Sequence, residues 1–149
     1  MTRVFTACAA GLAMTVALAA SADTATDMLG AWSGEYTAVS PTNSSGAGPR
    51  FNNAEVVFEI KEQQGTVFWG EGRWRRQGSE DWTRHEITGN LSADGSGKIG
   101  MVESSSDPSF SVNALIDAQL DDDKLYVNLR SLSRGTTYSA VLERSDVSN

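Results

Sequence analysis

The sequence predicts an all-β fold, an eight-stranded antiparallel up-and-down barrel. Apolar and polar residues alternate in short stretches, most strictly in residues 110–120, where the helical period of 3.6 is absent. Eight such stretches follow one another at spacings of about 10–14 residues, with turn-forming residues between them. Because closure leaves no exposed sheet edge, this meander favours a barrel over the alternative, a sandwich of two sheets.

The individual strands are defined by their alternation and by the turns that separate them. The connection 40–49 is rich in Ser, Asn, Gly and Pro and exceeds the usual length of about 4–6 residues, so we expect a mobile lid over one mouth of the barrel. Asp94-Gly95 is a hairpin turn, which would place Ile87 opposite Glu103. The expected strands are residues 31–39, 55–61, 66–76, 82–91, 98–104, 110–120, 124–131 and 136–144.

Residues 1–22 have the pattern of a secretory signal peptide. Arg3 precedes an apolar core, and Ala20-Ser21-Ala22 supplies the small residues of a cleavage site. We therefore expect an exported protein, periplasmic or extracellular, with one β-barrel domain over residues 23–149; a retained membrane anchor is the alternative. No other stretch is apolar enough to span a membrane. The only cysteine, Cys8, lies in the signal, so the mature chain would have no disulfide.

The charge of the chain limits the partners it can take. The net charge is −7, and it becomes −8 when Arg3 is removed with the signal. Such an acidic chain favours solubility and argues against nucleic acid as a partner. The Asp residues at 117 and 121–123 lack the ligand spacing of a calcium loop, and one histidine cannot form a multi-histidine metal site. We expect no metal and no cofactor.

A short motif on the first strand resembles a known group of barrels. Gly30-x-Trp32, followed by the long first loop and the meander, is similar to the calycin barrels, the lipocalins and avidins. The resemblance implies that Trp32 closes one barrel end and that the interior binds a small molecule. It also implies that an arginine of the last strands, Arg144 or Arg130, packs on Trp32.

Aromatic side chains are the main candidates for an interior ligand site. The chain has four tryptophans, whose large apolar rings and single N–H donors suit a cavity with few polar contacts, although packing is their commoner role. An eight-stranded barrel is wide enough for its own side chains or for one small ligand. The candidate ligand-binding residues are Trp32, Tyr36, Phe58, Trp69, His85, Glu103 and Tyr138.

His85 and Glu103 form a possible polar pair inside the barrel. His85 is the only histidine and lies on the apolar face of its strand, diagonal to Glu103 across the expected hairpin. The pair could perform acid–base chemistry or anchor a polar group of a ligand. The alternative is a hydrated or hydrogen-bonded pair near the barrel mouth with no further role.

A cluster of arginines and tryptophans marks a possible interaction surface. Trp69 and Trp74 lie on opposite faces of one strand, so one of them should point outward. Arginine interleaved with Trp suits anionic or aromatic partners. The alternative is a hairpin whose arginines pair with nearby acids, Glu71, Glu80, Asp81 and Glu86. The candidate surface residues are Arg73, Trp74, Arg75, Arg76, Trp82 and Arg84.

These features predict an exported, non-catalytic barrel that binds a small hydrophobic or amphipathic ligand in its interior. One alternative is an envelope interaction protein that uses the Arg/Trp hairpin to bind an anionic glycan, lipid or protein. Another is a cofactor-free barrel enzyme that uses His85 and Glu103. The oligomeric state and the ligand do not follow from the sequence.

Overall fold

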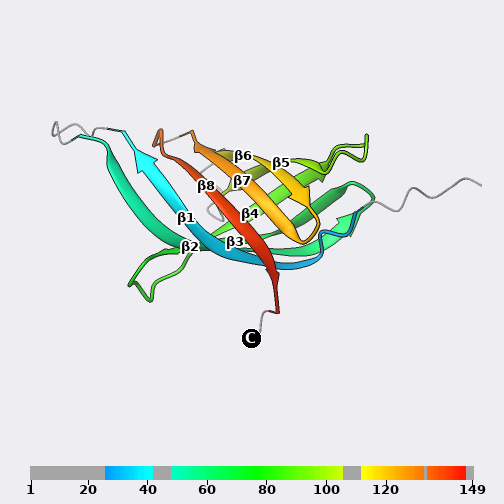
Figure 1. Ribbon diagram of the computed structural model, residues 1–149, viewed down its shortest axis with the longest axis horizontal. Helices are drawn as coiled ribbons and strands as arrows, with labels where there is room; N and C mark the ends of the chain where they lie inside the picture. Colours follow the sequence, from blue (N-terminus) through cyan, green and yellow to red (C-terminus); the bar gives the residue numbers. More distant parts are fainter. Residues whose placement is uncertain (1–25, 42–47, 106–111, 133, 147–149) are drawn as a thin grey trace, which may run out of the picture.

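The protein is a closed antiparallel barrel of eight strands in up-and-down order, as predicted (Figure 1). The computed structural model describes residues 26–41, 48–105, 112–132 and 134–146. The expected signal peptide and most of the expected lid loop lie outside the described residues. The strands are β1 (Gly30–Ser40), β2 (Arg50–Gln64), β3 (Val67–Arg76), β4 (Thr83–Leu91), β5 (Lys98–Ser104), β6 (Val112–Asp121), β7 (Lys124–Ser131) and β8 (Thr137–Ser145).

Every strand pairs with its neighbours in sequence, and β1 pairs with β8 to close the barrel. The predicted register between β4 and β5 is confirmed, because Ile87 lies opposite Glu103. β2 is much longer than the predicted stretch 55–61. Its polar ends carry no alternation, yet they pair with β1 and with β3. Among the described residues, no helix is long and apolar enough to cross a bilayer.

In an up-and-down barrel, the ends of the odd strands and the starts of the even strands meet at one end, which we call the mouth. The opposite end, the closed end, is filled by inward apolar side chains, and several of them, including Trp32, Phe58, Ile87 and Leu142, are essentially inaccessible to water. Two inward glycines allow this packing. A Cβ at Gly72 would lie 2.8 Å from Ile87 Cδ1, and one at Gly89 would lie 2.5 Å from the Phe68 ring.

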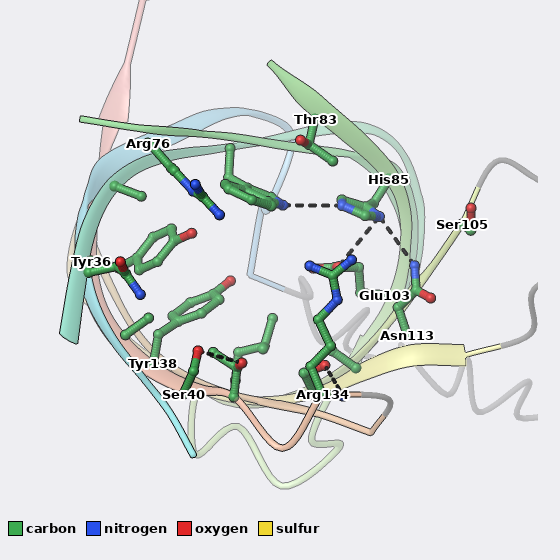
Figure 2. Close-up of a pocket in the computed structure, with 18 residues that line it drawn as sticks. Tyr36, Ser40, Arg76, Thr83, His85, Glu103, Ser105, Asn113, Arg134 and Tyr138 are labelled. Carbon is green, nitrogen blue, oxygen red and sulfur yellow. Dashed lines mark hydrogen bonds and ion pairs between the residues drawn. The ribbon is translucent and has the colours of Figure 1, made fainter. Parts of the chain in front are cut away.

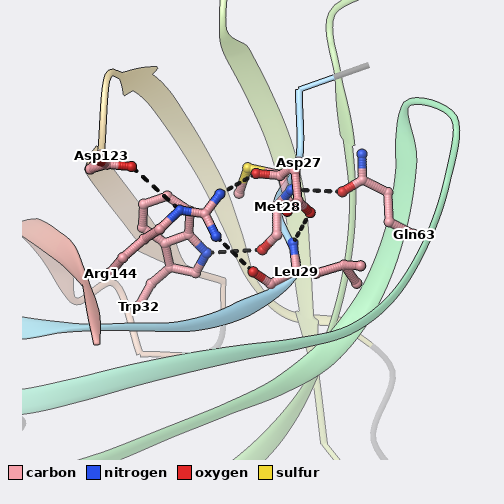
Figure 3. A network of polar contacts seen from close by, with 7 residues as sticks. All are labelled: Asp27, Met28, Leu29, Trp32, Gln63, Asp123 and Arg144. Carbon is pink, nitrogen blue, oxygen red and sulfur yellow. Dashed lines mark hydrogen bonds and ion pairs between the residues drawn. The ribbon is translucent and has the colours of Figure 1, made fainter. Parts of the chain in front are cut away.

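Trp32 is held at the closed end by a network of polar contacts (Figure 3). Its Nε1–H donates to the carbonyl oxygen of Met28 at 3.0 Å, and the Arg144 guanidinium lies 4.4 Å from the ring centroid. Arg144 also donates to the carbonyl oxygens of Leu29 and Asp27. Stacking of a guanidinium on indole combines a cation–π attraction with apolar contact. These contacts hold the segment before β1 across the closed end of the barrel.

Candidate functional site

A cavity of about 400 Å³ occupies the mouth half of the barrel (Figure 2). Each of the eight strands contributes to its wall. The space is open because apolar side chains fill the closed half of the barrel but not the mouth half. The volume lies within the range of about 300–1,000 Å³ typical of small-molecule sites. The lining residues are Tyr36, Ala38, Ser40, Asn52, Ala54, Trp74, Arg76, Thr83, His85, Glu103, Ser105, Asn113, Ala114, Leu129, Ser131, Arg134, Thr136 and Tyr138.

Two stacked tyrosines form an aromatic wall of the cavity. The ring centroids of Tyr36 and Tyr138 are 4.3 Å apart with an interplanar angle of 20°. Closure of the barrel brings them together, because β1 and β8 are paired there. Burial raises the pKa of Tyr36 to about 12 and that of Tyr138 well above its usual value, with the Glu103 carboxylate as a further cause in both. Both hydroxyls therefore stay neutral at physiological pH.

His85 is held in the cavity wall through both ring nitrogens. Trp74 Nε1 donates to His85 Nε2 at 3.2 Å. An indole N–H can only donate, so Nε2 carries the lone pair and the proton of the neutral ring is on Nδ1. That nitrogen lies 3.5 Å from Glu103 Oε1 and 3.3 Å from Asn113 Nδ2. Because Asn113 Nδ2 is itself a donor, the Glu103 oxygen is the acceptor that the Nδ1 proton faces in this tautomer. Burial, with a smaller effect of Arg134, lowers the pKa of His85, which keeps the ring neutral near pH 7.

Glu103 is a buried carboxyl group with only 9% of its surface exposed. Burial raises the pKa of Glu103 from the usual 4.5 to about 7, because the ionised form loses its hydration. Among the described residues, the one basic side chain within ion-pair distance of its carboxyl group is His85, whose ring is neutral near pH 7. Glu103 therefore changes between acid and carboxylate near neutral pH.

Two arginines face the cavity from its rim. Arg76, at the end of β3, and Arg134, before β8, point into the mouth from different sides (Figure 2). Within the described part of the chain, no carboxylate forms an ion pair with either guanidinium. Glu103 is the one acidic residue among those that line the cavity. The charged side chains that line the cavity are therefore mostly cationic, although the chain as a whole carries a net charge of −7.

The structure brings four of the seven predicted ligand-site residues to the cavity, Tyr36, His85, Glu103 and Tyr138. Trp32 and Phe58 lie in the filled core at the closed end and do not line the cavity. Trp69, which was expected in the interior, faces outward beneath Lys61, whose Nζ is 5.6 Å from the ring centroid.

Two residues expected on the outer surface, Trp74 and Arg76, line the cavity instead. The reason is the alternation along β3, which points Phe68, Gly70, Gly72, Trp74 and Arg76 inward. The glycines removed the apolar signal that would have marked this face in the sequence. Trp69 and Trp74 do point to opposite faces, but Trp69 was expected inside and points outward, whereas Trp74 was expected outside and points inward.

The other predicted surface residues face outward and contact one another or nearby acids. The guanidinium carbons of Arg73 and Arg75 lie 5.3 Å and 4.6 Å from the Trp82 ring centroid. Arg75 forms an ion pair with Glu55 at 2.7 Å, and Arg84 NH1 lies 4.0 Å from Glu71. Of the four acids named in the alternative considered from the sequence, only Glu71 forms an ion-pair contact with one of these arginines in the described part of the chain, since Arg75 pairs with Glu55 of β2.

The sequence reasoning missed most of the rim. The signal for it was present, because inward residues near the ends of odd strands and the starts of even strands must share one end of an up-and-down barrel. Applying this rule to the predicted strands would have grouped Ala114 and Leu129 with Tyr36 and His85. Asn52 lies outside the predicted stretch 55–61, and strict alternation in the stretch 110–120 would have pointed Asn113 outward. Arg134 lies in a turn, where alternation gives no direction.

Comparisons with protein-family models, curated protein sequences and solved structures found no match to this chain. Among the described residues, no group of three or more His, Cys, Asp or Glu side chains is placed to hold a metal ion. The cavity and its polar groups are therefore the observations from which a function can be argued.

Proposed function

We propose that the protein is an exported, non-catalytic barrel of calycin type that binds one small amphipathic molecule in the mouth cavity. The observation that carries the proposal is the cavity itself, about 400 Å³ in volume and walled by aromatic, small apolar and polar side chains. A few polar groups set in an apolar pocket are typical of small-molecule sites, where they fix the orientation of the ligand.

Two further features support parts of the proposal. The calycin assignment is supported by Gly30-x-Trp32 and by Arg144, which stacks on Trp32 at the closed end. The assignment to an exported protein is supported by the sequence pattern of residues 1–22.

A non-catalytic role agrees with the contacts of His85. Both ring nitrogens already face protein partners, Trp74 on one side and Glu103 with Asn113 on the other. A general base must reach the proton that it removes, either directly or through one water. His85 has no nitrogen left for that purpose in this arrangement, so we assign the pair a binding role.

Native mass spectrometry of protein purified from its own compartment tests this function. We expect a mature chain that begins at Asp23 and carries one small molecule. Ala38→Phe, which places a ring in the cavity, should abolish the bound mass. Thr37→Phe, on the outward face of the same strand, should keep it. A bound molecule that Ala38→Phe leaves in place would contradict the proposal, as would a chain with no bound mass under any condition of purification.

A further inference from the structure

We propose that the cavity selects anions, and that its ligand is an aromatic amphipathic anion whose acidic group is bound by Arg76 and Arg134. The inference rests on the proposed function and specifies the chemical class of the ligand. The ring system of the ligand would lie against the wall formed by Tyr36 and Tyr138.

The two rim arginines differ from four other arginines of the barrel, which lie close to carboxylates. Arg75, Arg84, Arg130 and Arg144 lie within 4.0 Å of carboxylates, those of Glu55, Glu71, Asp117 and Asp123. The chain has 19 acidic residues against 12 basic ones, so carboxylates are plentiful. Arg76 and Arg134 nevertheless face the cavity with no such partner among the described residues. Two permanent cations at the entrance of one cavity form a binding site for an anion.

Glu103 is the one acidic residue among the described residues that line the cavity, and it faces two arginines. It lies below the rim, and the titratable or charged groups around it are His85 on β4, Tyr36 on β1, Tyr138 on β8, Arg76 on β3 and Arg134 before β8, with the Asn113 amide on β6. The hydroxyls and the imidazole are neutral near pH 7. Because burial raises the pKa of Glu103 to about 7, its charge does not cancel the two arginines in mildly acidic solution. Above that pH, one carboxylate still faces two arginines, so the charged groups that line the cavity keep a net positive charge.

Aromatic rings form much of the apolar wall of the cavity. The stacked pair of Tyr36 and Tyr138 lines the cavity together with the partly buried ring of Trp74. Three alanines, with small side chains, complete this part of the wall, Ala38, Ala54 and Ala114. Aromatic rings prefer offset stacking or edge-to-face contact with other rings. A planar ligand body fills such a space better than a flexible chain, which would lose more conformational entropy on binding.

Two fluorescent probes with the same aromatic skeleton test the inference. The probe 8-anilinonaphthalene-1-sulfonate carries a sulfonate, and N-phenyl-1-naphthylamine lacks it. We expect the anionic probe to bind saturably at one site. The neutral probe should bind with an affinity at least about tenfold lower. The double variant Arg76→Gln/Arg134→Gln should weaken the anionic probe by at least about tenfold and leave the neutral probe unchanged.

The matched control is Arg75→Gln/Arg84→Gln, which removes the same charge from the outer surface and should leave both probes unchanged. Equal affinity for the two probes, or no effect of the Arg76/Arg134 substitutions, would overturn the inference that the cavity selects anions. Neither result would contradict the proposed function, which is the binding of a small molecule in the cavity. If neither probe binds saturably, or if Ala38→Phe leaves their binding intact, the proposed function itself fails. Binding counts only for variants that keep the wild-type melting temperature, because the anionic probe also binds partly unfolded chains.

A pH series gives an independent readout. Affinity for the anionic probe should fall as the pH rises from about 6 to about 8, since Glu103 becomes negatively charged beside the ligand. Glu103→Gln should abolish this fall. Affinity that rises over the same range would indicate a cation site and would overturn the inference.

Discussion

Replacing Glu103 by Gln should stabilise the barrel at alkaline pH and have little effect in acid. The amide has nearly the shape of the carboxyl group and is neutral at every pH. In the unfolded chain Glu103 ionises near the usual pKa of 4.5, whereas in the folded barrel burial raises its pKa to about 7. Between these values the folded protein binds one more proton than the unfolded chain. Stability from this group is therefore full below about pH 4.5 and is lost as the pH rises through about 7.

The size of the effect follows from the two pKa values. Each tenfold difference in proton affinity is worth about 1.4 kcal/mol, so the shift from 4.5 to about 7 corresponds to a loss on the order of 3 kcal/mol at pH 8. His85 works in the opposite direction. Its lowered pKa costs stability as the pH falls below the usual 6.5. The wild-type profile alone thus mixes two opposing contributions.

The difference between variant and wild type isolates Glu103. Urea unfolding followed by tryptophan fluorescence should give equal free energies of unfolding near pH 4.5 and a difference of on the order of 3 kcal/mol in favour of Glu103→Gln at pH 8. Glu35→Gln, at an exposed position of β1, is the matched control and should show no such growth. A difference that is constant with pH, or a variant less stable than wild type at pH 8, would refute the reasoning.

Two further substitutions test the ends of the barrel. Trp74→Phe removes the N–H that donates to His85 Nε2, so the pKa of His85 should rise. NMR titration of this single histidine measures the pKa, and Trp69→Phe, on the outward face, is the control. An unchanged pKa in Trp74→Phe would contradict the contact. Trp32→Ala should lower the free energy of unfolding by about 3–5 kcal/mol, because a fully buried indole leaves a cavity. A loss no larger than that of the outward variant Trp69→Ala in the same urea assay would contradict the role of Trp32 in closing the barrel.

Local patterns in the sequence were enough to predict the barrel and one of its registers. Period-two alternation gave the strands, and Asp94-Gly95 fixed the β4–β5 pairing that sets Glu103 diagonal to His85. Both are short-range effects, because a hairpin turn and the pleat determine which residues face each other. The boundaries of β2 were missed because its polar ends are held by pairing with neighbouring strands rather than by an apolar face.

The cavity depended on contacts between distant parts of the chain. Tyr36 and Tyr138 meet only because the first and last strands close the barrel. The direction of Trp74 was hidden by the two inward glycines of β3, which separate it from Phe68, the other apolar residue on that face. Sequence alone also could not show that side chains fill one half of the barrel and leave the other half open. This depends on the total volume of the inward side chains that all eight strands place in each half.

The fastening of the chain at the closed end has a practical consequence for handling the protein. Arg144 donates to the carbonyl oxygens of Asp27 and Leu29, and Ala31 pairs with Ser145. The described chain therefore both enters and leaves the barrel at the end away from the mouth. A label, a fusion partner or a solid support attached where the described chain enters or leaves the barrel would therefore lie at the closed end, away from the cavity. Barrels immobilised in this way would all present their mouths to the solution, which makes surface-based binding assays suitable for screening ligands.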